Sequence, residues 1–250
     1  MIITTAIIKG GTGKTTTSLA LSQAAVSEGR HVLAVDMDPQ GSLSYYLGGD
    51  AGKPGSWQVL QGHPAAGAVQ STPQGIDLIA GSQDLALASS SAGSAMRLKR
   101  AVKPLEWAYD LIIIDCAPHI GELLFNGIYA ADMLLIPMTT DSLSIQGLSQ
   151  IMEIGRRIAK NSSSSFTAGS ILTMYDKRSK INRFYRDNVA EIGAKIGAPL
   201  IGTIRRGVAV QEAQLYQKSL YEYAPKSKPA QDYLDLFHKI MMGDANEEKL

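Results

Sequence analysis

A glycine-rich loop near the N-terminus constrains this chain more than any other feature. The stretch IIKGGTGKTTT, residues 7–17, follows an apolar run that starts at Met1 and precedes a pattern typical of a helix over residues 14–27. Glycines at positions 10, 11 and 13 let backbone N–H groups turn inward and surround phosphate oxygens. The start of the helix adds its partial positive charge. A strand, a glycine loop and a helix in this order predict a phosphate-binding loop.

The loop departs from the usual pattern G-x-x-x-x-G-K-[ST]. Counting back from Gly13, Ile8 stands where the first glycine should be, and Lys9 adds a second lysine. Lys14 already occupies the position that reaches the β- and γ-phosphates. We therefore interpret Lys9 as a side chain that points outward, toward a second nucleotide held by a facing copy of the chain. The alternative is a solvated loop lysine.

The other loop residues complete a nucleotide site. The hydroxyl of Thr15 is expected to ligate Mg²⁺, and Thr16 to contact the α-phosphate. The residues expected to bind the nucleotide in this loop are Lys9, Gly10, Gly11, Thr12, Gly13, Lys14, Thr15 and Thr16.

Acidic residues end two of the predicted strands. Asp115 closes the apolar run LIIID, and Asp36 and Asp38 lie in VDMDPQG. Open α/β sheets bind ligands at the carboxyl ends of their strands. Asp115 fits an indirect, water-mediated ligand of Mg²⁺. Asp38, just before Pro39, could orient a water for attack on the γ-phosphate. For Asp36, direct metal ligation and anchoring of the loop are equally open.

Strand and helix patterns alternate along most of the chain. This alternation predicts an α/β fold with a doubly wound, mostly parallel sheet flanked by helices. We expect a single ATPase domain over residues 1–242 with a flexible tail at 243–250, and residues 48–75 are the least regular segment. Strands are expected over residues 1–8, 31–38, 75–81, 109–118, 133–139, 168–175 and 199–204, and helices over 14–27, around 148–158, 181–195 and 229–242.

Composition excludes several classes of protein. The single cysteine, Cys116, excludes a disulfide framework and multi-cysteine metal sites within one chain. A formal charge of +1 gives no overall basic field, so DNA contact would need a local patch. The apolar runs fall far short of the ~20 residues of a membrane span. With no basic leader or cleavage site at the N-terminus, we expect a cytoplasmic protein.

Three long segments together resemble the ParA family of deviant Walker ATPases. They are KGGTGKTT (residues 9–16), VDMDPQGSLSYYLG (35–48) and the stretch from YDLIIIDCAP to SIQGL (109–148). The resemblance continues through ILTMYDKRSKIN and YAPKSKPAQDYLDL, so it covers nearly the whole chain. It implies ATP and Mg²⁺ as cofactors, with Lys9, Lys14 and Asp38 in catalysis. Thr15, Asp36 and Asp115 are then the expected metal site.

The resemblance also implies a cellular role. Proteins of this family bind ATP, dimerise around two ATP molecules and then hold nonspecific DNA. A small centromere-binding protein of the ParB type stimulates a weak intrinsic hydrolysis and releases them. The chain resembles the short branch without an N-terminal helix-turn-helix domain. We therefore expect a plasmid or chromosome segregation ATPase associated with the nucleoid.

One segment departs from the family pattern. Where the family often reads IPRNVRLAEAP, residues 204–214 read IRRGVAVQEAQ. Arg205 replaces a proline, Gly207 an asparagine, and Ala209 an arginine associated with DNA binding. Since this segment borders the adenine in the family, we expect Arg205 and Gly207 beside the base. Arg205 and Arg206 are candidates to bind DNA in place of that arginine.

A second basic segment lies further upstream. Five cations fall within ten residues with no acid between them, and such a cluster binds nucleic-acid phosphates through counterion release. A solvated helix face is an equally open interpretation. The cluster consists of Lys177, Arg178, Lys180, Arg183 and Arg186.

Three other functions within the same superfamily are alternatives. A membrane-cycling ATPase resembling MinD needs a C-terminal amphipathic helix rich in Lys and Arg. Here QDYLDLFHKIMM, residues 231–242, carries two aspartates and one lysine, so we expect no membrane binding. An ATPase that positions a protein cargo would share the DNA-binding chemistry. A metabolic or redox ATPase is the last alternative, and its iron-protein version needs two cysteines per chain.

Overall fold

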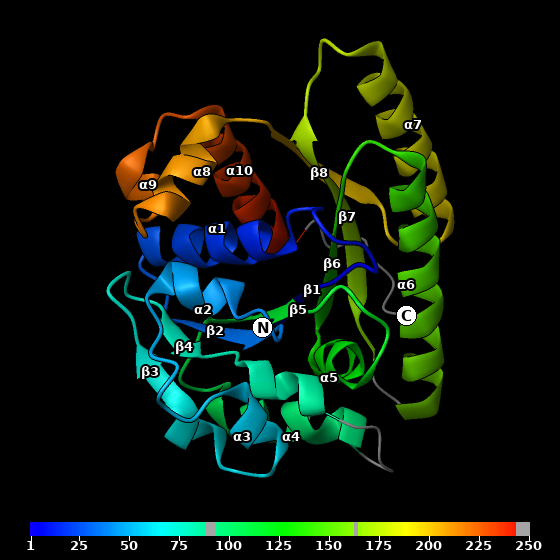
Figure 1. Ribbon diagram of the computed structural model, residues 1–250. Helices are drawn as coiled ribbons and strands as arrows, with labels where there is room; N and C mark the ends of the chain where they lie inside the picture. Colours follow the sequence, from blue (N-terminus) through cyan, green and yellow to red (C-terminus); the bar gives the residue numbers. More distant parts are fainter. Residues whose placement is uncertain (89–93, 163–164, 244–250) are drawn as a thin grey trace.

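The computed structural model describes residues 1–88, 94–162 and 165–243 (Figure 1). Within these residues, eight strands form one sheet in the order β3-β4-β2-β5-β1-β6-β7-β8. All neighbouring strands run parallel except β3, which is antiparallel to β4. The strands are β1 (Ile2–Thr5), β2 (Val32–Met37), β3 (Val69–Ser71), β4 (Asp77–Ile79), β5 (Leu111–Cys116), β6 (Met133–Met138), β7 (Thr167–Tyr175) and β8 (Leu200–Arg205). The expected fold class is confirmed.

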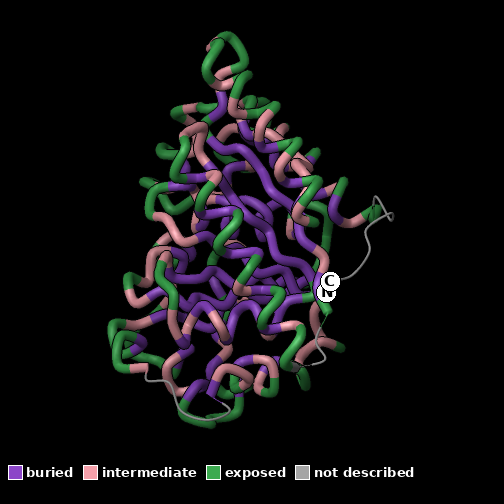
Figure 2. Tube along the Cα trace, turned by 90° about the vertical axis from the view of Figure 1, so that its right-hand side faces the viewer, coloured by how far each residue is buried: buried purple, intermediate pink, exposed green. Residues whose placement is uncertain are grey.

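Helices cover both faces of the sheet. One apolar core lies under α3 (Ser56–Leu60), α4 (Arg97–Val102), α5 (Glu122–Ala130), α6 (Ser142–Ser162) and α7 (Lys180–Lys195). The other lies under α1 (Lys14–Ser27), α2 (Ser42–Leu47), α8 (Val208–Leu215), α9 (Leu220–Tyr223) and α10 (Lys228–Met242). Figure 1 shows the two sets on opposite sides, and Figure 2 shows buried strands running between exposed outer surfaces.

The strand sequences explain this double layer. Successive side chains of a strand point to opposite faces, so a strand buried on both sides must be apolar at every position. In β5, Ile112 and Ile114 belong to one core, whereas Leu111 and Ile113 belong to the other. The continuous apolar run in β5 therefore places it in the middle of the sheet, as expected from the sequence.

Several parts of the fold differ from the expectations. The helices α2, α4, α5, α8 and α9 lie outside the ranges where helices were expected. The segment 48–75, expected to be irregular, contains α3 and the edge strand β3. Both are too short for hydrophobic periodicity to indicate them, because a pattern needs several repeats. The first strand ends at Thr5, so residues 6–13 all belong to the loop before α1. The tail expected at 243–250 lies outside the described residues except for Gly243.

The parallel arrangement gathers the functional loops at one edge of the sheet. In the strand register Thr5 is paired with Asp115, and Asp115 is also paired with Asp36. The phosphate loop after β1 and the acids that end β2 and β5 therefore meet at the same edge. Ligands bind at this edge in open α/β sheets.

The C-terminal helix is part of the core. Tyr233, Leu236, Phe237 and Ile240 of α10 are buried in the core beside α1 and β8. Its apolar face is thus occupied by the chain itself. In the part of the chain that the structure describes, no helix has the length and apolar character to span a bilayer.

We predict that Gly127→Ala destabilises the protein by about 1–3 kcal/mol. A Cβ at this position of α5 would lie 2.3 Å from the Cys116 sulfur and 3.2 Å from a methyl of Thr4. This overlap should outweigh the gain of about 1 kcal/mol that alanine brings to a helix. Urea denaturation measures the change in the free energy of unfolding.

Gly67→Ala is the matched control for this substitution. A Cβ at Gly67 meets open space, so its effect should stay within about 0.5 kcal/mol. Adding Cys116→Ala to Gly127→Ala should recover part of the stability, because it removes the atom closest to the new methyl group. Equal stability of Gly127→Ala and Gly67→Ala would contradict the packing described here.

Candidate functional site

The phosphate loop joins β1 to α1 in a left-handed turn. Gly11 and Gly13 have φ angles of +73° and +86°, a region that side chains other than glycine rarely enter. Gly13 directly precedes α1, and its carbonyl accepts the hydrogen bond from the N–H of Thr17 that opens the helix. The turn therefore directs the start of α1 toward the space above the sheet edge, where an anion is favoured.

Two side chains of the loop suit an incoming phosphate. Lys14 is buried, and its Nζ donates to the Lys9 carbonyl at 3.0 Å. Burial lowers the pKa of Lys14, and the charges of Asp115 and Asp38 offset part of that shift. The Oγ1 of Thr12 is also buried and has no hydrogen-bond partner among the residues that the structure describes. A buried hydroxyl without a partner costs free energy, and a phosphate oxygen would satisfy it.

Asp115 lies under the loop and is held by hydroxyl groups. Thr15 donates to its Oδ2 at 2.6 Å, and Ser18 donates to its Oδ1 at 3.0 Å. Burial is the main cause that raises the pKa of Asp115, and the negative charge of Asp36 raises it further. The structure thus brings together Thr15 and Asp115, which the sequence predicts as metal-site residues.

A magnesium ion would fit this arrangement through few protein ligands. Among the described residues, no group of three His, Cys, Asp or Glu side chains could hold a metal by itself. Mg²⁺ commonly binds through one or two protein groups together with substrate phosphates and water. The Thr15 hydroxyl and the Asp115 carboxylate are the protein groups of this kind here.

Asp36 and Asp38 differ in their surroundings. The Oδ2 of Asp36 accepts hydrogen bonds from the N–H and the hydroxyl of Ser44, at 2.9 and 2.7 Å, and its Oδ1 accepts from the N–H of Asp38. Burial raises the pKa of Asp36, while these hydrogen bonds oppose the shift. Of the two interpretations left open by the sequence, the geometry favours loop anchoring over metal ligation. Asp38 is buried, and its Oδ1 accepts from the N–H of Gln40 at 2.9 Å.

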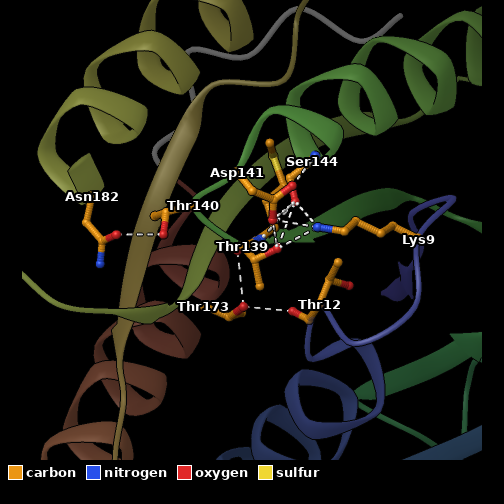
Figure 3. Close-up of polar contacts among 9 residues, drawn as sticks. Lys9, Thr12, Thr139, Thr140, Asp141, Ser144, Thr173 and Asn182 are labelled. Carbon is orange, nitrogen blue, oxygen red and sulfur yellow. Dashed lines mark hydrogen bonds and ion pairs between the residues drawn. The ribbon is translucent and has the colours of Figure 1, made fainter.

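Lys9 does not point outward in the single chain, contrary to the expectation. Its Nζ lies 2.5 Å from Oδ2 of Asp141 and also donates to Thr139 and Ser144 (Figure 3). The side chain bends back because the polar turn after β6 offers it a carboxylate. Burial alone would raise the pKa of Asp141, but hydrogen bonds from Lys9 and its neighbours outweigh this and lower it to about 2.

A cavity of about 310 Å³ adjoins the phosphate loop at Gly11 and Gly13. Its lining includes Gly13, Thr16, Arg205, Gly207, Gln214 and Tyr233. The amide of Gln214 donates to the hydroxyl of Thr16 at 3.2 Å, which ties α8 to the phosphate loop. The two residues expected beside the base, Arg205 and Gly207, therefore lie next to the loop in space although they are distant from it in sequence.

The departure at Gly207 has a steric reason. A Cβ at Gly207 would lie 2.7 Å from the ring of Pro229 at the start of α10. An asparagine here would displace that ring. The cavity wall is therefore formed without a side chain at this position.

Arg205, which was expected to bind DNA, is held by an acid of its own chain in this geometry. Its guanidinium binds Asp232 of α10 in a bidentate ion pair, with the shortest distance 2.6 Å. Its backbone N–H also donates to that carboxylate. Arg205 thus holds β8 to α10, and its charge is compensated within the chain. Arg206 follows at the end of the strand, with no ion pair to the described residues.

The second basic segment is partly compensated as well. Arg178 pairs with Asp176, and Arg186 pairs with Asp187. Arg183 donates to the carbonyls of two preceding loop residues. Lys177 and Lys180 form no ion pair with any residue that the structure describes. The run therefore has less unpaired positive charge than its sequence suggests, because Asp176 and Asp187 at its two ends pair with two of its arginines.

Both basic segments start at the same sheet edge. In the register of β7 and β8, Tyr175 is paired with Arg205. The loop at 176–179 and the residue Arg206 therefore leave adjacent strands in the same direction. Among the described residues of this edge, the side chains of Lys177, Lys180 and Arg206 form no ion pair, and Arg183, which binds only neutral carbonyls, also keeps its charge.

Sequence reasoning missed the residues that bind Lys9. Thr139 and Asp141 lie between the buried strand β6 and α6, and Ser144 lies in the first turn of α6. Their signal was the polar run TTDS directly after an apolar strand, at the edge where ligands bind. It also missed Asp232, whose position on α10 carries no signal for an ion pair with a strand.

Comparison with known proteins agrees with this geometry. The family model described as an AAA domain matches residues 1–168. The sporulation initiation inhibitor protein Soj of Bacillus subtilis is 31% identical, over 93% of this chain and 94% of its own. The chromosome-partitioning ATPase Soj of Thermus thermophilus is 30% identical, over 93% and 92%.

Solved structures give the same result. A cobyrinic acid a,c-diamide synthase from Mycobacterium smegmatis, with bound ADP and magnesium, is 30% identical with a TM-score of 0.78, covering 96% of this chain and 93% of its own. Apo McdA from Cyanothece is 26% identical with a TM-score of 0.83, covering 94% and 98%. The septum site-determining protein MinD of Pyrococcus horikoshii, complexed with Mg-ADP, is 26% identical with a TM-score of 0.78, covering 97% of both chains.

We predict that Ser44→Ala lowers the free energy of unfolding by about 1–3 kcal/mol in buffer without Mg²⁺ or nucleotide. The substitution removes the hydroxyl that donates to Asp36 and accepts from the N–H of Gly81, both buried. Ser42→Ala, half-buried at the start of the same helix, is the control and should change little. Unchanged stability of Ser44→Ala would mean that the Ser44 hydroxyl contributes nothing to anchoring this loop.

Proposed function

Since this chain belongs to the ParA/Soj/MinD family of P-loop ATPases, we propose that it hydrolyses ATP as a dimer and holds nonspecific DNA in its ATP-bound form. The observation that carries the proposal is the pair of lysines at one phosphate loop. Lys14 is enclosed beneath the loop, whereas Lys9 leaves it toward α6. One loop needs only one lysine to bind the phosphates of its own nucleotide. The second lysine is therefore available for the phosphates of a nucleotide held by a second chain.

The residues of the loop would hold ATP and Mg²⁺. Backbone N–H groups of residues 10–15, the Lys14 ammonium and the unpaired hydroxyl of Thr12 would contact the phosphates. Thr15 and Asp115 would hold the metal, and the cavity beside Thr16 would take the base. Bound Mg²⁺ would neutralise charge on the β- and γ-phosphates.

Asp38 is the residue we assign to positioning water. It lies directly after β2 at the ligand-binding edge, and the N–H of Gln40 orients its carboxylate. Asp36 accepts a hydrogen bond from the backbone N–H of Asp38, which anchors the loop that carries the Asp38 carboxylate. A carboxylate held in place at this edge can accept a hydrogen bond from a water molecule and thereby orient the lone pair of that water toward the γ-phosphate.

Lys9 is assigned a role across the dimer interface. A cation delivered by a second chain can stabilise the charge of a phosphoryl-transfer transition state by a factor of ~10³ or more in rate. In this arrangement a single chain binds ATP but is incomplete for hydrolysis. Hydrolysis then becomes coupled to the association of two chains.

The DNA surface proposed is the sheet edge formed by Lys177, Lys180 and Arg206. Their charges are not paired within the described chain, and they leave adjacent strands on the same side. Such a patch binds phosphates without reading bases, which suits nonspecific DNA. We further propose that residues 1–242 act as one ATPase unit on the nucleoid in the cytoplasm. A small centromere-binding protein of the ParB type would stimulate hydrolysis and end DNA binding.

Membrane positioning of the MinD type is the alternative that the structure favours least. That function needs an apolar helix face free to enter the lipid. The apolar residues of α10 are instead packed beside α1 and β8. This packing supports the DNA-binding function over the membrane function.

We predict that Lys9→Ala and Asp38→Ala both abolish most ATP hydrolysis but differ in assembly. Lys9→Ala should bind nucleotide as a single chain, because Lys14 and the loop remain. Asp38→Ala should accumulate as an ATP-bound dimer, because the dimer forms and the water is no longer positioned. Phosphate release, nucleotide titration and sedimentation velocity measure the three quantities. Normal turnover by Lys9→Ala, or a purely monomeric Asp38→Ala, would contradict the proposal.

We predict that the triple variant Lys177→Ala/Lys180→Ala/Arg206→Ala loses most DNA retention in ATP, while retaining dimerisation. The dependence of binding on salt should become shallower by about 0.9 in log–log slope for each DNA phosphate that the variant no longer binds. Retention should be measured with ATP, with ADP and without nucleotide. The control is Arg157→Ala, an exposed arginine on α6 paired with Glu153. Equal retention in all three nucleotide states would argue against an ATP-controlled DNA switch.

A further inference from the structure

The Lys9 ammonium occupies a complete binding site within its own chain. Its Nζ donates to Asp141 at 2.5 Å, to Thr139 at 3.0 Å and to Ser144 at 3.2 Å (Figure 3). A lysine has three N–H donors and no acceptor, so these three contacts use its full capacity. The ammonium therefore cannot reach another chain's phosphates without giving up this site.

The residues of this site are also held together by contacts that do not involve Lys9. The Oδ1 of Asp141 accepts from the N–H of Ser144 at 3.0 Å, which caps the first turn of α6. The Oδ2 accepts from the hydroxyl of Thr139, and Thr139 and Ser144 are themselves within 2.9 Å of each other. The start of α6 thus fixes the carboxylate that receives Lys9. The contact ties the phosphate loop to the β6–α6 turn.

We propose that Asp141 is a positioning residue that stores Lys9 in its own chain until the phosphates of a facing chain take over the ammonium. This inference rests on the proposed role of Lys9 across the interface. A triphosphate offers more negative charge than one carboxylate, so the exchange is favourable only when a nucleotide-bound partner is in place. Asp141 thereby keeps the lysine away from bulk solvent and sets the threshold for dimerisation.

The free-energy cost that the Lys9–Asp141 pair adds to dimerisation is small. The side chains of Lys9 and Asp141 are 24% and 39% exposed, so water screens the pair. A partly exposed ion pair shifts an equilibrium by up to about fivefold. A dimer opens two such pairs, so removing them should tighten dimerisation by up to about 25-fold. Asp141 thus weakens dimerisation by a small factor and does not prevent it.

The test uses Asp141→Asn in the full chain. Asparagine keeps a carbonyl that can cap the N–H of Ser144, but it removes the charge that holds Lys9. The control is Glu153→Gln, which removes one negative charge from the same helix at an exposed pair with Arg157. Circular dichroism and thermal unfolding establish that both variants fold.

The first readout is the reactivity of Lys9 without nucleotide. An amine-reactive reagent, with modified peptides quantified by mass spectrometry, should label Lys9 about two- to fivefold faster in Asp141→Asn, the factor expected for a partly exposed pair. Glu153→Gln should label at the wild-type rate. Equal rates for wild type and Asp141→Asn would overturn the stored state of Lys9, and would leave the proposed role of Lys9 in the dimer standing.

The second readout is dimer affinity with Mg²⁺ and a non-hydrolysable ATP analogue. Asp141→Asn should form the dimer more tightly than wild type, up to the factor given above, whereas Glu153→Gln should form it with wild-type affinity. Faster labelling without tighter dimerisation, or weaker dimerisation, would overturn the threshold. A wild-type chain that stays monomeric at all concentrations would instead refute the proposed dimer function, and this inference with it.

Discussion

The pairing of β1 with β5 is the constraint on which the functional edge depends. Thr5 and Asp115 are partners in the register at the ends of these two strands, and both strands are buried on both faces. The phosphate loop starts directly after β1 and thus cannot shift relative to Asp115 without disrupting the sheet. A short distance between Thr15 and Asp115 follows from this pairing. The rigid centre of the fold therefore determines where a metal and a phosphate can be bound together.

Three cations around the phosphate loop have partners within the chain. Lys14 donates to a carbonyl of its own loop, Lys9 is paired with Asp141, and Arg205 is paired with Asp232. Buried or partly buried charges without partners are costly, so the single chain satisfies each of them internally. A nucleotide and a second chain would have to replace these partners one by one. Assembly is then an exchange of contacts, which makes it sensitive to the nucleotide state.

Much of the fold was predictable because its signals are local and repeated. The apolar runs of the central strands and the spacing of α6 and α10 gave the α/β class, and α1 begins and ends at the expected residues. The edge strand β3 and the helices α2, α3, α4, α5, α8 and α9 were missed, since segments of three to nine residues span too few repeats to establish a period. Lys14, Thr15 and Asp115 were predicted as site residues from their places in a strand–loop–helix context, and the structure places them at one sheet edge. The ion pair of Arg205 could not be predicted, because its partner Asp232 lies on a distant helix.

The sequence by itself determined the phosphate loop, the order of strands and helices, and the carboxylates at the strand ends. These depend on neighbours within a few residues, where spacing and residue type carry the information. Only the tertiary structure decided where the long charged side chains point. The Lys9 ammonium, at the end of a flexible stem, turned to Asp141, and Arg205 turned to Asp232, because the packing of α6 and α10 brought those carboxylates within reach. Charge attracts through space, and the pattern along the chain does not record which opposite charge will be nearest.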